Sequence, residues 1–531
     1  MPSRNIKVPI PLPLRGLNTV NPYIEIESLF AREFTNYILI NGRPWIRPGI
    51  NSFLYHAATN RHVHWFDLDS SIGILDNGDI RNIGSGAGAT SIGGSPAFNA
   101  TRVRHNTLNL VFGCREPRDA VNPFTAWSFT PLYQTATAIS SGCSHKGRLY
   151  SSDGDTIEYS TVGATTGTMA GSFQISDFMN GQKVQRIFSV SINPSITTEN
   201  VFVAFGAGGR VLVYGGEYPG SATWSLIAQF DMPQPISNVG FVEIDGDIFV
   251  ATEQYCYWFR DLFSGGAQTA YFNSPTIPIE NLWQGIGWSS NYTVAAVSHA
   301  FYVPKIDAIV VMATLKNSGP NNLALLAEYQ NTGVYFCYHR KYRAWSVWQA
   351  APFYTPVISS VDNGSGTYTN TTDIYAVGTK TEVVKLENTS CIDEYDSASN
   401  SILIQTSWKT PYFSGFKGQG MNLKGVRLNF RNPNEAYFEK IRAIFNYSDY
   451  KAPLGWYTQS MVTQINPGIN SESNFSGSSL EYGQYNPFIG LSGNGESLSI
   501  QFTDKRTNSA SSGERSIIAA TMYIESGSDF I

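Results

Sequence analysis

Short runs of apolar or alternating residues follow one another along the chain, and Gly, Asp, Asn or Pro closes each run. The runs recur about every 8 to 12 residues, which is typical of a sandwich, a barrel or a propeller. Helical periodicity is nearly absent, because apolar residues seldom recur at i, i+3 and i+4 for more than about two turns. The best helix candidate runs from Ile26 to Tyr37. The pattern therefore predicts an all-β protein.

A weak internal repeat favours the propeller among these architectures. Four stretches share a turn, an apolar strand, a second polar or Gly turn and another strand; they are GRLYSSDGDTIEYS from Gly147, GGRVLVYGGE from Gly208, DGDIFVATEQYCYWF from Asp245 and TDIYAVGTKTEVVKL from Thr372. Each stretch is the hairpin expected within one blade. Blades bury their faces only against neighbouring blades, so the array must close or be capped. We predict a β-propeller over residues 51–400 and leave its blade number open.

The segments on either side of the repeat have a different character. Residues 1–50 are rich in Pro and carry six Lys or Arg against three acids. They have little apolar material for a core of their own, so we predict an N-terminal arm or platform that leans on a neighbouring subunit. After residue 400, alternating strands are separated by long Ser, Asn and Gly loops. This rhythm predicts a separate C-terminal β-sandwich-like domain over residues 401–531.

Composition agrees with a β-rich protein and narrows its partners. Charged residues make up 15% of the chain, aromatic residues 13%, and the net charge is −5. A negative chain argues against a firm grip on nucleic acid, although transient contact with DNA stays open. The five Cys are far apart and never form CxxC, which argues against a disulfide framework and a zinc site. We find no signal-peptide pattern and no apolar run of about 18 residues, so we expect cytoplasmic synthesis and no stable membrane insertion.

Enzymatic alternatives must be weighed because many propellers are glycosidases or sialidases. The nearest match to the sialidase repeat SxDxGxTW surrounds Asp153, and it lacks both the Gly and the Trp. Asp-Gly-Asp begins at Asp153 and again at Asp245, where a hairpin turn is a better interpretation than a calcium loop. An EF-hand loop from Asp153 would need Glu at its twelfth position, which is Ala164. GxSxG and HExxH are absent, but a pair of distant acids stays possible, so a glycan-active enzyme remains an alternative.

Other candidate sites also have simpler structural interpretations. His62 and His64 lie on one face of a strand, as a metal pair would, but no third ligand is evident. The Gly-rich segment 84–94 lacks the GK[ST] of a phosphate loop, which favours a flexible loop. Five tryptophans could form a sugar platform or stack on bases, although large aromatics more often fill the space between blades; they are Trp224, Trp283, Trp288, Trp345 and Trp348. We therefore predict no catalytic, cofactor-binding or metal-binding residue.

One segment carries a family resemblance. Between Val211 and Phe259, a strand leads into Tyr-x-Gly-x-x-Pro-x-Ser, then Trp-Ser-Leu, then a Gly-Asp-hydrophobic strand. The corresponding residues are Tyr214, Gly216, Pro219, Ser221, Trp224, Ser225, Leu226, Gly246 and Asp247. This order resembles a stretch of the β-propeller tail nozzle proteins, also called tail hub or tubular tail proteins, of short-tailed bacteriophages.

Three further stretches agree with that resemblance. They are the opening GLNTVNPYIEIESLFAREFTNYILINGRPWIRPGI, the blade start HKGRLY, and YRAWSVW, which contains Trp345. The chain departs from the family at Asn21, where an acid is usual, and at Cys256-Tyr257, where Gly precedes Val-Pro. The shared motifs describe blade architecture and not an active site, and most of the C-terminal domain lies outside them.

The resemblance implies a structural virion protein of the podovirus type without enzymatic activity. Six copies would form a ring below the portal or adaptor protein, continue the DNA channel, gate DNA ejection and carry tail fibres or a needle. Its location would be the virion tail after synthesis in the host bacterial cytoplasm. A neutral or mildly acidic channel would let DNA pass without tight binding, since each neutralised phosphate adds affinity. A receptor-binding or spike virion protein is the alternative, ahead of a glycan-active enzyme.

Overall fold

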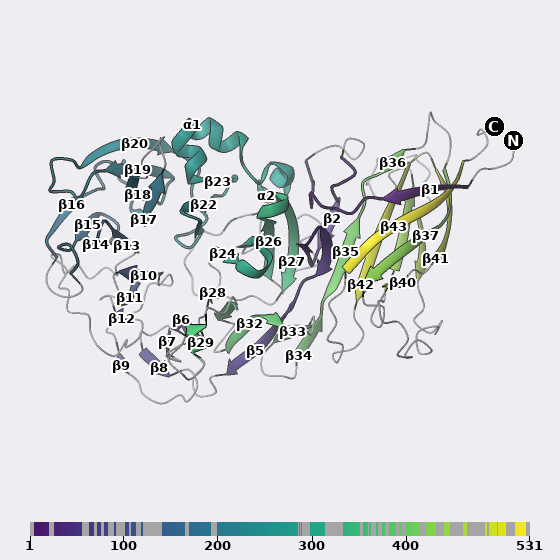
Figure 1. The fold of residues 1–531 in the computed structure, drawn as a ribbon, viewed down its shortest axis with the longest axis horizontal. Helices are drawn as coiled ribbons and strands as arrows, with labels where there is room; N and C mark the ends of the chain where they lie inside the picture. Colours follow the sequence, from purple (N-terminus) through teal and green to yellow (C-terminus); the bar gives the residue numbers. More distant parts are fainter. Residues whose placement is uncertain are drawn as a thin grey trace.

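Strands dominate the protein, and most of them pair with the next strand along the chain (Figure 1). The computed structural model describes residues 5–20, 26–55, 63–67, 72–75, 79–82, 90–91, 101–105, 108–112, 118–119, 141–164, 169–192, 199–284, 286, 288, 298–313, 333–350, 354–358, 361–362, 368–369, 374–377, 382–388, 392–395, 400–414, 421–431, 440–445, 460–464, 484–485, 488–495, 497–505 and 516–526. In the strands between residues 50 and 119 and between 354 and 403, only the course of the backbone is described for most positions.

The strands between residues 63 and 388 form successive antiparallel sheets, which we call blades 1 to 7. Blade 1 contains β6 (Val63–Asp67), β7 (Ile72–Leu75), β8 (Asp79–Asn82) and β9 (Thr90–Ser91); blade 2 contains β10 (Thr101–His105), β11 (Leu108–Phe112) and β12 (Arg118–Asp119). Blade 3 contains β13 (Ser141–His145), β14 (Arg148–Ser152), β15 (Thr156–Tyr159) and β16 (Gly171–Gln174); blade 4 contains β17 (Val184–Ile192), β18 (Glu199–Gly206), β19 (Arg210–Gly215) and β20 (Ser225–Asp231).

The later blades include one strand from the start of the chain. Blade 5 contains β21 (Phe241–Ile244), β22 (Asp247–Ala251) and β23 (Cys256–Trp258); blade 6 contains β24 (His299–Val303), β25 (Ala308–Ala313), β26 (Gly333–His339) and β27 (Ala344–Ala350). Blade 7 contains β28 (Tyr354–Ile358), β31 (Ile374–Val377), β32 (Glu382–Asn388) and the N-terminal strand β5 (Gly49–Tyr55). A small hairpin of β29 (Val361–Asp362) and β30 (Tyr368–Thr369) accompanies blade 7, and β33 (Ile392–Tyr395) and β34 (Asn400–Leu403) extend its sheet beyond β5.

The blades close into a ring. First strands of successive blades lie side by side: β10 next to β13, β13 next to β17, β21 next to β24, and β24 next to β28. The last and first blades also meet, because β28 lies beside β6. Blade 7 is completed by antiparallel pairing of β5 with β32, with Tyr55 opposite Glu382. The described strands thus form a β-propeller of seven blades, which confirms the all-β propeller predicted from the sequence.

Alternation within each strand explains how a blade binds both of its neighbours. In β19, Val211 and Val213 belong to a core cluster shared with blade 5. Leu212 and Tyr214, which point the opposite way, belong to a cluster shared with blade 3. All four side chains are buried. A blade between two neighbours therefore needs apolar residues on both faces, so its inner strands read as continuous apolar runs.

The predicted hairpin turns are confirmed. Asp153 Oδ1 accepts the backbone N–H groups of Asp155 (3.0 Å) and Thr156 (2.8 Å), so its carboxylate forms the turn itself. Asp245 and Gly246 both have positive φ, 52° and 72°, between β21 and β22. Two successive residues of positive φ match the twist of a tight hairpin.

The predicted helix from Ile26 to Tyr37 is wrong. The described part of this segment contains turns and β2 (Glu33–Thr35), which pairs with β35 (Gln405–Lys409) and touches β27 in parallel. Pairing with distant strands overrides the weak local periodicity. Helix forms instead at α1 (Phe259–Phe272), η1 (Ile277–Ile279) and α2 (Glu280–Gln284), directly after the third strand of blade 5.

The N-terminal segment is woven into the sheets that follow it. β1 (Asn5–Ile10) pairs with β43 (Ser516–Ser526), and the hairpin of β3 (Tyr37–Ile40) and β4 (Arg43–Ile46) joins the same sheet through β4. The apolar residues of this segment enter a shared core, because Ile10, Leu17, Phe34 and Leu39 are buried in a cluster that also holds residues of later strands. Contact of this segment with a neighbouring subunit stays a prediction.

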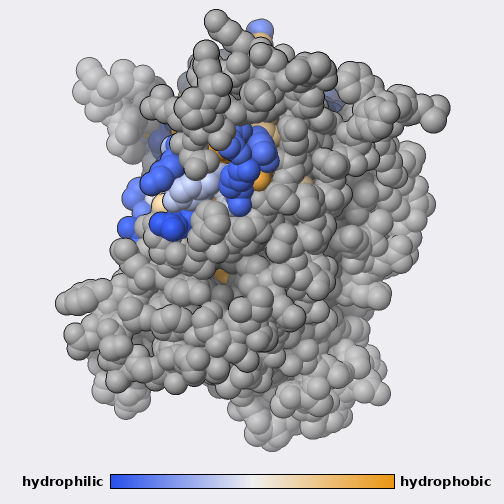
Figure 2. All heavy atoms as spheres, turned by 90° about the vertical axis from the view of Figure 1, so that its right-hand side faces the viewer, coloured by the Kyte–Doolittle hydropathy of each residue, from blue (hydrophilic) through white to orange (hydrophobic). Residues whose placement is uncertain are grey.

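Two facing sheets make up the C-terminal region. One contains β43, β37 (Met421–Arg431), β40 (Gln484–Tyr485), β41 (Phe488–Gly495) and the strands β1, β3 and β4; the other contains β2, β35, β36 (Phe413–Ser414), β38 (Lys440–Phe445), β39 (Ser460–Gln464) and β42 (Ser497–Lys505). Leu423 and Met522 from the first sheet share a core cluster with Ile500 from the second. This arrangement is sandwich-like, and the described surface at this end is mainly hydrophilic (Figure 2).

Arg47 offers a test of how the N-terminal segment is held. This arginine is buried, and its guanidinium donates to Asn36 Oδ1 and to the carbonyl oxygens of Pro48 and Gln349. We expect Arg47→Ala to lower stability by about 2 to 4 kcal/mol, because buried acceptors lose their donor. Thermal and urea unfolding would measure the loss. Arg15→Ala removes an exposed ion pair and should cost at most about 1 kcal/mol. Equal effects would contradict this role.

Candidate functional site

Several residues singled out in the sequence, which we call the blade signature, lie in or beside the loop between β19 and β20; the full set is Tyr214, Gly216, Pro219, Trp224, Gly246, Asp247 and Trp345. Tyr214 is buried near the end of β19, and Gly216 and Pro219 lie in the loop. Trp224 then folds back, and its ring lies nearly parallel to Tyr214 (5.3 Å between centroids) and to Tyr150 of blade 3 (6.4 Å). The loop of blade 4 is therefore stacked onto blade 3 by aromatic rings.

Polar contacts fix the same loop. Gly216 has φ 99°, and a Cβ there would lie 2.2 Å from the carbonyl oxygen of Thr223, so only glycine fits. Lys146 Nζ donates to the Gly216 carbonyl oxygen (2.7 Å) from the β13–β14 turn. The Arg148 guanidinium lies 4.0 Å from the centre of the Tyr218 ring. These contacts hold the β19–β20 loop of blade 4 against blade 3, and we call this loop the inter-blade lock.

His145 and Ser189 form a serine–histidine contact beneath this lock. Nδ1 of His145 lies 2.8 Å from Ser189 Oγ, across the seam between β13 and β17. Burial, helped by the neighbouring Lys146 charge, lowers the pKa of His145 to about 4. An imidazole with so low a pKa accepts a proton poorly at neutral pH. The geometry therefore suits a neutral core histidine better than a general base.

Gly246 and Asp247 connect the first hairpin of blade 5 to helix α1. Gly246 completes the left-handed turn described above, which places Asp247 at the start of β22. Asp247 Oδ1 accepts the N–H groups of Ile248 (2.8 Å) and Arg260 (3.0 Å). Because Arg260 lies in the first turn of α1, Asp247 caps a helix that is remote along the chain. Burial raises the pKa of Asp247, although these hydrogen bonds oppose the shift.

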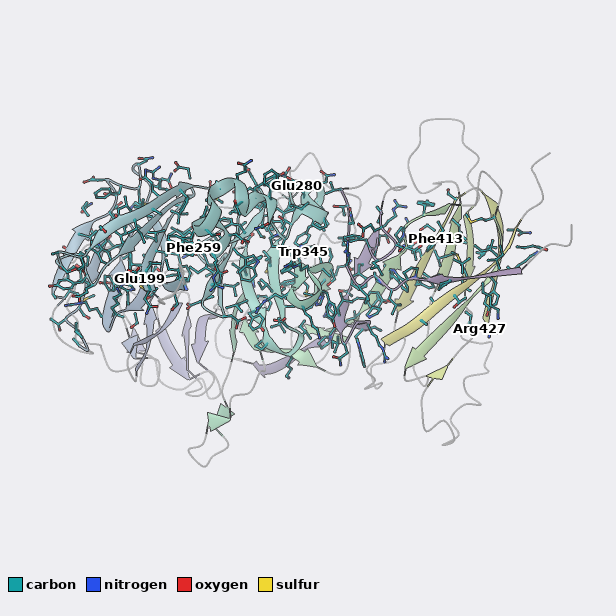
Figure 3. All side chains as sticks on the ribbon, turned by 45° about the horizontal axis from the view of Figure 1, so that its top comes forward. Glu199, Phe259, Glu280, Trp345, Phe413 and Arg427 are labelled. Carbon is teal, nitrogen blue, oxygen red and sulfur yellow. The ribbon has the colours of Figure 1, made fainter. Side chains whose placement is uncertain are left out.

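Trp345 is a core residue of blade 6, as Figure 3 shows in the middle of the molecule. Its Nε1 donates to the Pro275 carbonyl oxygen (2.6 Å), and its ring packs near Tyr338 and Trp283. The core role predicted for the tryptophans is confirmed for the buried members, which are Trp283, Trp288, Trp345 and Trp348. Trp224 is half-buried between two tyrosines. These rings leave little face for a sugar or a base.

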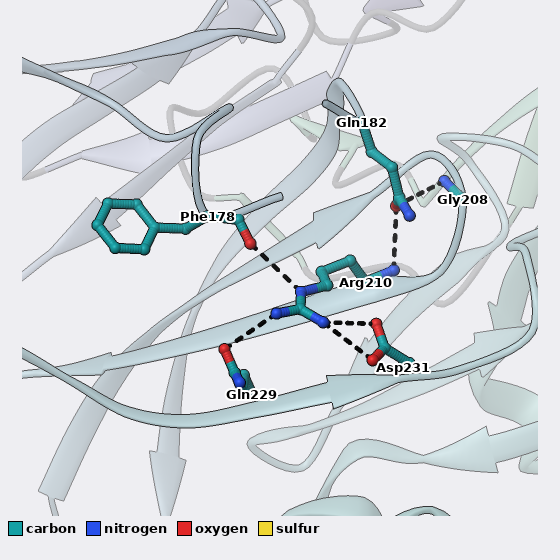
Figure 4. Close-up of polar contacts among 6 residues, drawn as sticks. All are labelled: Phe178, Gln182, Gly208, Arg210, Gln229 and Asp231. Atoms are coloured by element: carbon teal, nitrogen blue, oxygen red, sulfur yellow. Dashed lines mark hydrogen bonds and ion pairs between the residues drawn. The ribbon is translucent and has the colours of Figure 1, made fainter. Parts of the chain in front are cut away.

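Two arginines that sequence reasoning missed also join parts of the ring. Arg210 Nη1 binds both carboxylate oxygens of Asp231 at 2.9 Å, and its Nε donates to the Phe178 carbonyl oxygen (Figure 4). Arg340 binds Asp245 (2.6 Å) and Asp307 (3.3 Å), which lie on turns of blades 5 and 6. Arg210 therefore holds the segment after blade 3 to blade 4, and Arg340 holds blade 5 to blade 6.

A further group of ionisable residues lies on the first strands of blades 3 to 5. Burial lowers the pKa of Arg186 to about 10, and the charge of Glu243 opposes that shift. Burial also raises the pKa of Glu243 and of the Cys143 thiol. Among the described residues, the buried Nε and Nη1 atoms of Arg186 have no hydrogen-bond partner. Because burial raises its pKa, the Cys143 thiol is protonated and unsuited to nucleophilic attack.

Metal-ligand and membrane-span searches concern the described part of the chain only. There, no three His, Cys, Asp or Glu side chains come close enough together to hold a metal ion. No helix within the same residues combines the length and apolar content that a bilayer span requires. The side chains of His62 and His64 and most of segment 84–94 lie outside the described residues.

Comparisons with known proteins give only distant matches. No family model and no curated protein matches this chain. Among solved structures, BBS1N in complex with ARL6DN is similar at 11% identity and TM-score 0.36, over 65% of this chain and 98% of that one. U3-55K is similar at 11% and 0.33 (64% and 99%), and Chaetomium thermophilum Raptor at 8% and 0.36 (65% and 29%). Similarity this low carries no argument about function, and the propeller rests on strand pairing.

Asp247 gives a pH-dependent test of the cap. Asp247→Ala removes the acceptor for two backbone N–H groups and should cost about 1 to 2 kcal/mol, measured by thermal unfolding. Asp247→Asn keeps an acceptor oxygen without the charge. Because burial raises the folded pKa above 3.8, ionisation of Asp247 costs stability as pH rises from 3.8 through the raised pKa.

The Asn variant should therefore gain stability relative to the unmodified protein between about pH 4 and pH 7, since it carries no charge to bury. A gain of the same size at both pH values would mean that Asp247 is not desolvated. Asp177→Asn, which removes an exposed carboxylate elsewhere, is the control and should change stability by no more than about 0.5 kcal/mol at neutral pH.

Proposed function

We propose that the chain is a nozzle subunit of the tail of a short-tailed bacteriophage. The observation that carries the proposal is the residue order from Val211 to Phe259, which resembles that family. In the fold this segment spans β19 to β23, which are parts of two adjoining blades and the lock between blades 3 and 4. Residues that carry the resemblance therefore hold blade 4 against blade 3 and cap helix α1.

The architecture suits a rigid building block. Closure of the ring by β5 and the bridging of propeller and sandwich by β2 join remote parts of the chain. We propose that six copies form a ring in the virion tail, below the portal or adaptor protein and above fibres or a needle. Packaged DNA would pass through the central channel of this ring. The net charge of −5 supports passage without tight binding.

We further propose that the protein acts without a catalytic site. Three potentially reactive side chains have structural roles instead, which supports this proposal. His145 is neutral in the core, the Cys143 thiol is buried, and Asp247 caps a helix. Conduit function needs shape and stiffness rather than reacting groups.

Native mass measurement of the purified assembly tests the subunit arrangement. A species of six 58.5 kDa chains is expected for a nozzle. Three copies would favour the receptor-binding or spike alternative, because such proteins are commonly trimers. A monomer that turns over a polysaccharide would overturn the proposal in favour of an enzyme.

Filter binding of the assembly to duplex DNA tests whether the protein binds DNA only weakly. Near 150 mM salt we expect weak, sequence-independent retention, with a Kd of roughly 10⁻⁴ to 10⁻⁶ M or weaker. The reason is that a net negative chain neutralises few phosphates. Nanomolar, sequence-selective binding would contradict the conduit.

A further inference from the structure

Four tight turns meet at one end of blades 5 and 6. They are the β3–β4 turn at Asn41–Gly42, the β21–β22 turn at Asp245–Gly246, and the 3-10 turns η2 (Pro304–Ile306) and η3 (Arg340–Tyr342). The Gly42 N–H donates to Tyr342 Oη at 2.7 Å. The Arg340 N–H donates to the Asp307 carbonyl oxygen at 3.1 Å. These contacts, with the Arg340–Asp245 ion pair, hold the four turns together.

Basic residues crowd this end of the propeller. We call them the basic rim: Arg43, Lys305, Arg340, Lys341 and Arg343. The nearby acids Asp245 and Asp307 are both engaged by Arg340. Within the described residues, neither carboxylate forms an ion pair with Arg43, Lys341 or Arg343.

Three cations of the rim have no carboxylate partner within the described residues: Arg43, Lys341 and Arg343. Lys341 and Arg343 are exposed, and Arg43 is half-buried. Lys341 Nζ lies 5.7 Å from the centre of the Tyr342 ring. Arg343 has φ 50° and stands at the tip of its turn. A chain with net charge −5 therefore carries a locally positive surface.

We propose that the basic rim contacts the phosphate backbone of double-stranded DNA. This inference rests on the proposed function and adds to it the surface that meets the DNA. Three unpaired cations can neutralise at most three phosphates per subunit, which gives a salt slope of roughly −2.7 in log K against log[salt]. Contacts this few bind weakly, so DNA can slide past them.

The surroundings of the rim favour a nucleic acid over an acidic protein. Protein interfaces bury apolar and aromatic side chains at their centre. The large exposed apolar side chains of the described residues are Ile6, Leu29, Val162, Phe178, Leu226, Ile227, Phe272 and Ile277. None of them lies on the four turns. Phosphate contacts need only cations and fix no sequence, which suits a polymer that moves through.

The test compares two triple variants of the assembled protein that change net charge equally. The rim variant is Arg43→Ala, Lys341→Ala and Arg343→Asn, where Asn tolerates the positive φ. The control variant removes three exposed cations elsewhere, Lys7→Ala, Lys183→Ala and Arg260→Ala. Fluorescence anisotropy with a labelled duplex of about 30 base pairs, between 50 and 200 mM salt, gives the slope for each.

In the rim variant, the slope of log K against log[salt] should become less negative by up to about 2.7 per subunit. The control variant should keep the slope of the unmodified assembly. Equal slopes for all three proteins would overturn the proposal. An unchanged slope together with loss of the native assembly mass would show that the rim binds another subunit, and the proposal would again be wrong.

Arg343→Asn alone provides a second variant should the triple variant not fold. Its expected loss of slope is about 0.9 for one phosphate contact. A full-size assembly with an unchanged slope rejects the rim and leaves the nozzle standing. A monomeric protein with a reduced slope rejects the nozzle and leaves the rim as a DNA contact.

Discussion

Pairing of β5 with β32 is the interaction on which the rest of the propeller depends. Blade 4 is apolar on both faces, as the two core clusters on either side of β19 demonstrate. Such a sheet is stable only between two neighbours, so an open row would leave apolar faces in water. Blade 7 lacks its outer strand until the N-terminal β5 arrives at β32. The cost of joining residues so distant in sequence is offset by contacts made around the whole ring.

Closure also ties the propeller to the sandwich-like region. The chain that supplies β5 first supplies β1 to β4, and β2 touches β27 of blade 6 while it pairs with β35. Arg47 lies between β4 and β5 and binds a carbonyl oxygen of Gln349 at the end of β27. The two regions are therefore joined by shared strands and a buried arginine rather than by a free linker. This explains why the first residues have no separate core of their own.

Sequence patterns gave the repeating hairpins and their turns, because Gly and Asp at positions such as Asp245 and Gly246 have strong local preferences. The same patterns gave wrong predictions where contacts with residues distant in sequence determine the secondary structure. Within residues 26–37, the strand at residues 33–35 forms by pairing with residues 407–409. Helix α1 was missed because Gly265 and Gly266 disfavour helix. The clamp of Arg340 on Asp245 joins residues 95 positions apart, which no local pattern reports. The uses of His145 and Asp247 likewise depend on burial that only the fold creates.

The origin of β5 has a consequence for biosynthesis. Residues 49–55 leave the ribosome long before residues 382–388 exist, so blade 7 cannot be completed while the intervening blades are being translated. During that interval the nascent chain holds an apolar N-terminal segment without its partners, and chaperones or early blades must shield it. Termination early in the message yields a chain with an open ring, which quality control can recognise by its exposed strand edges.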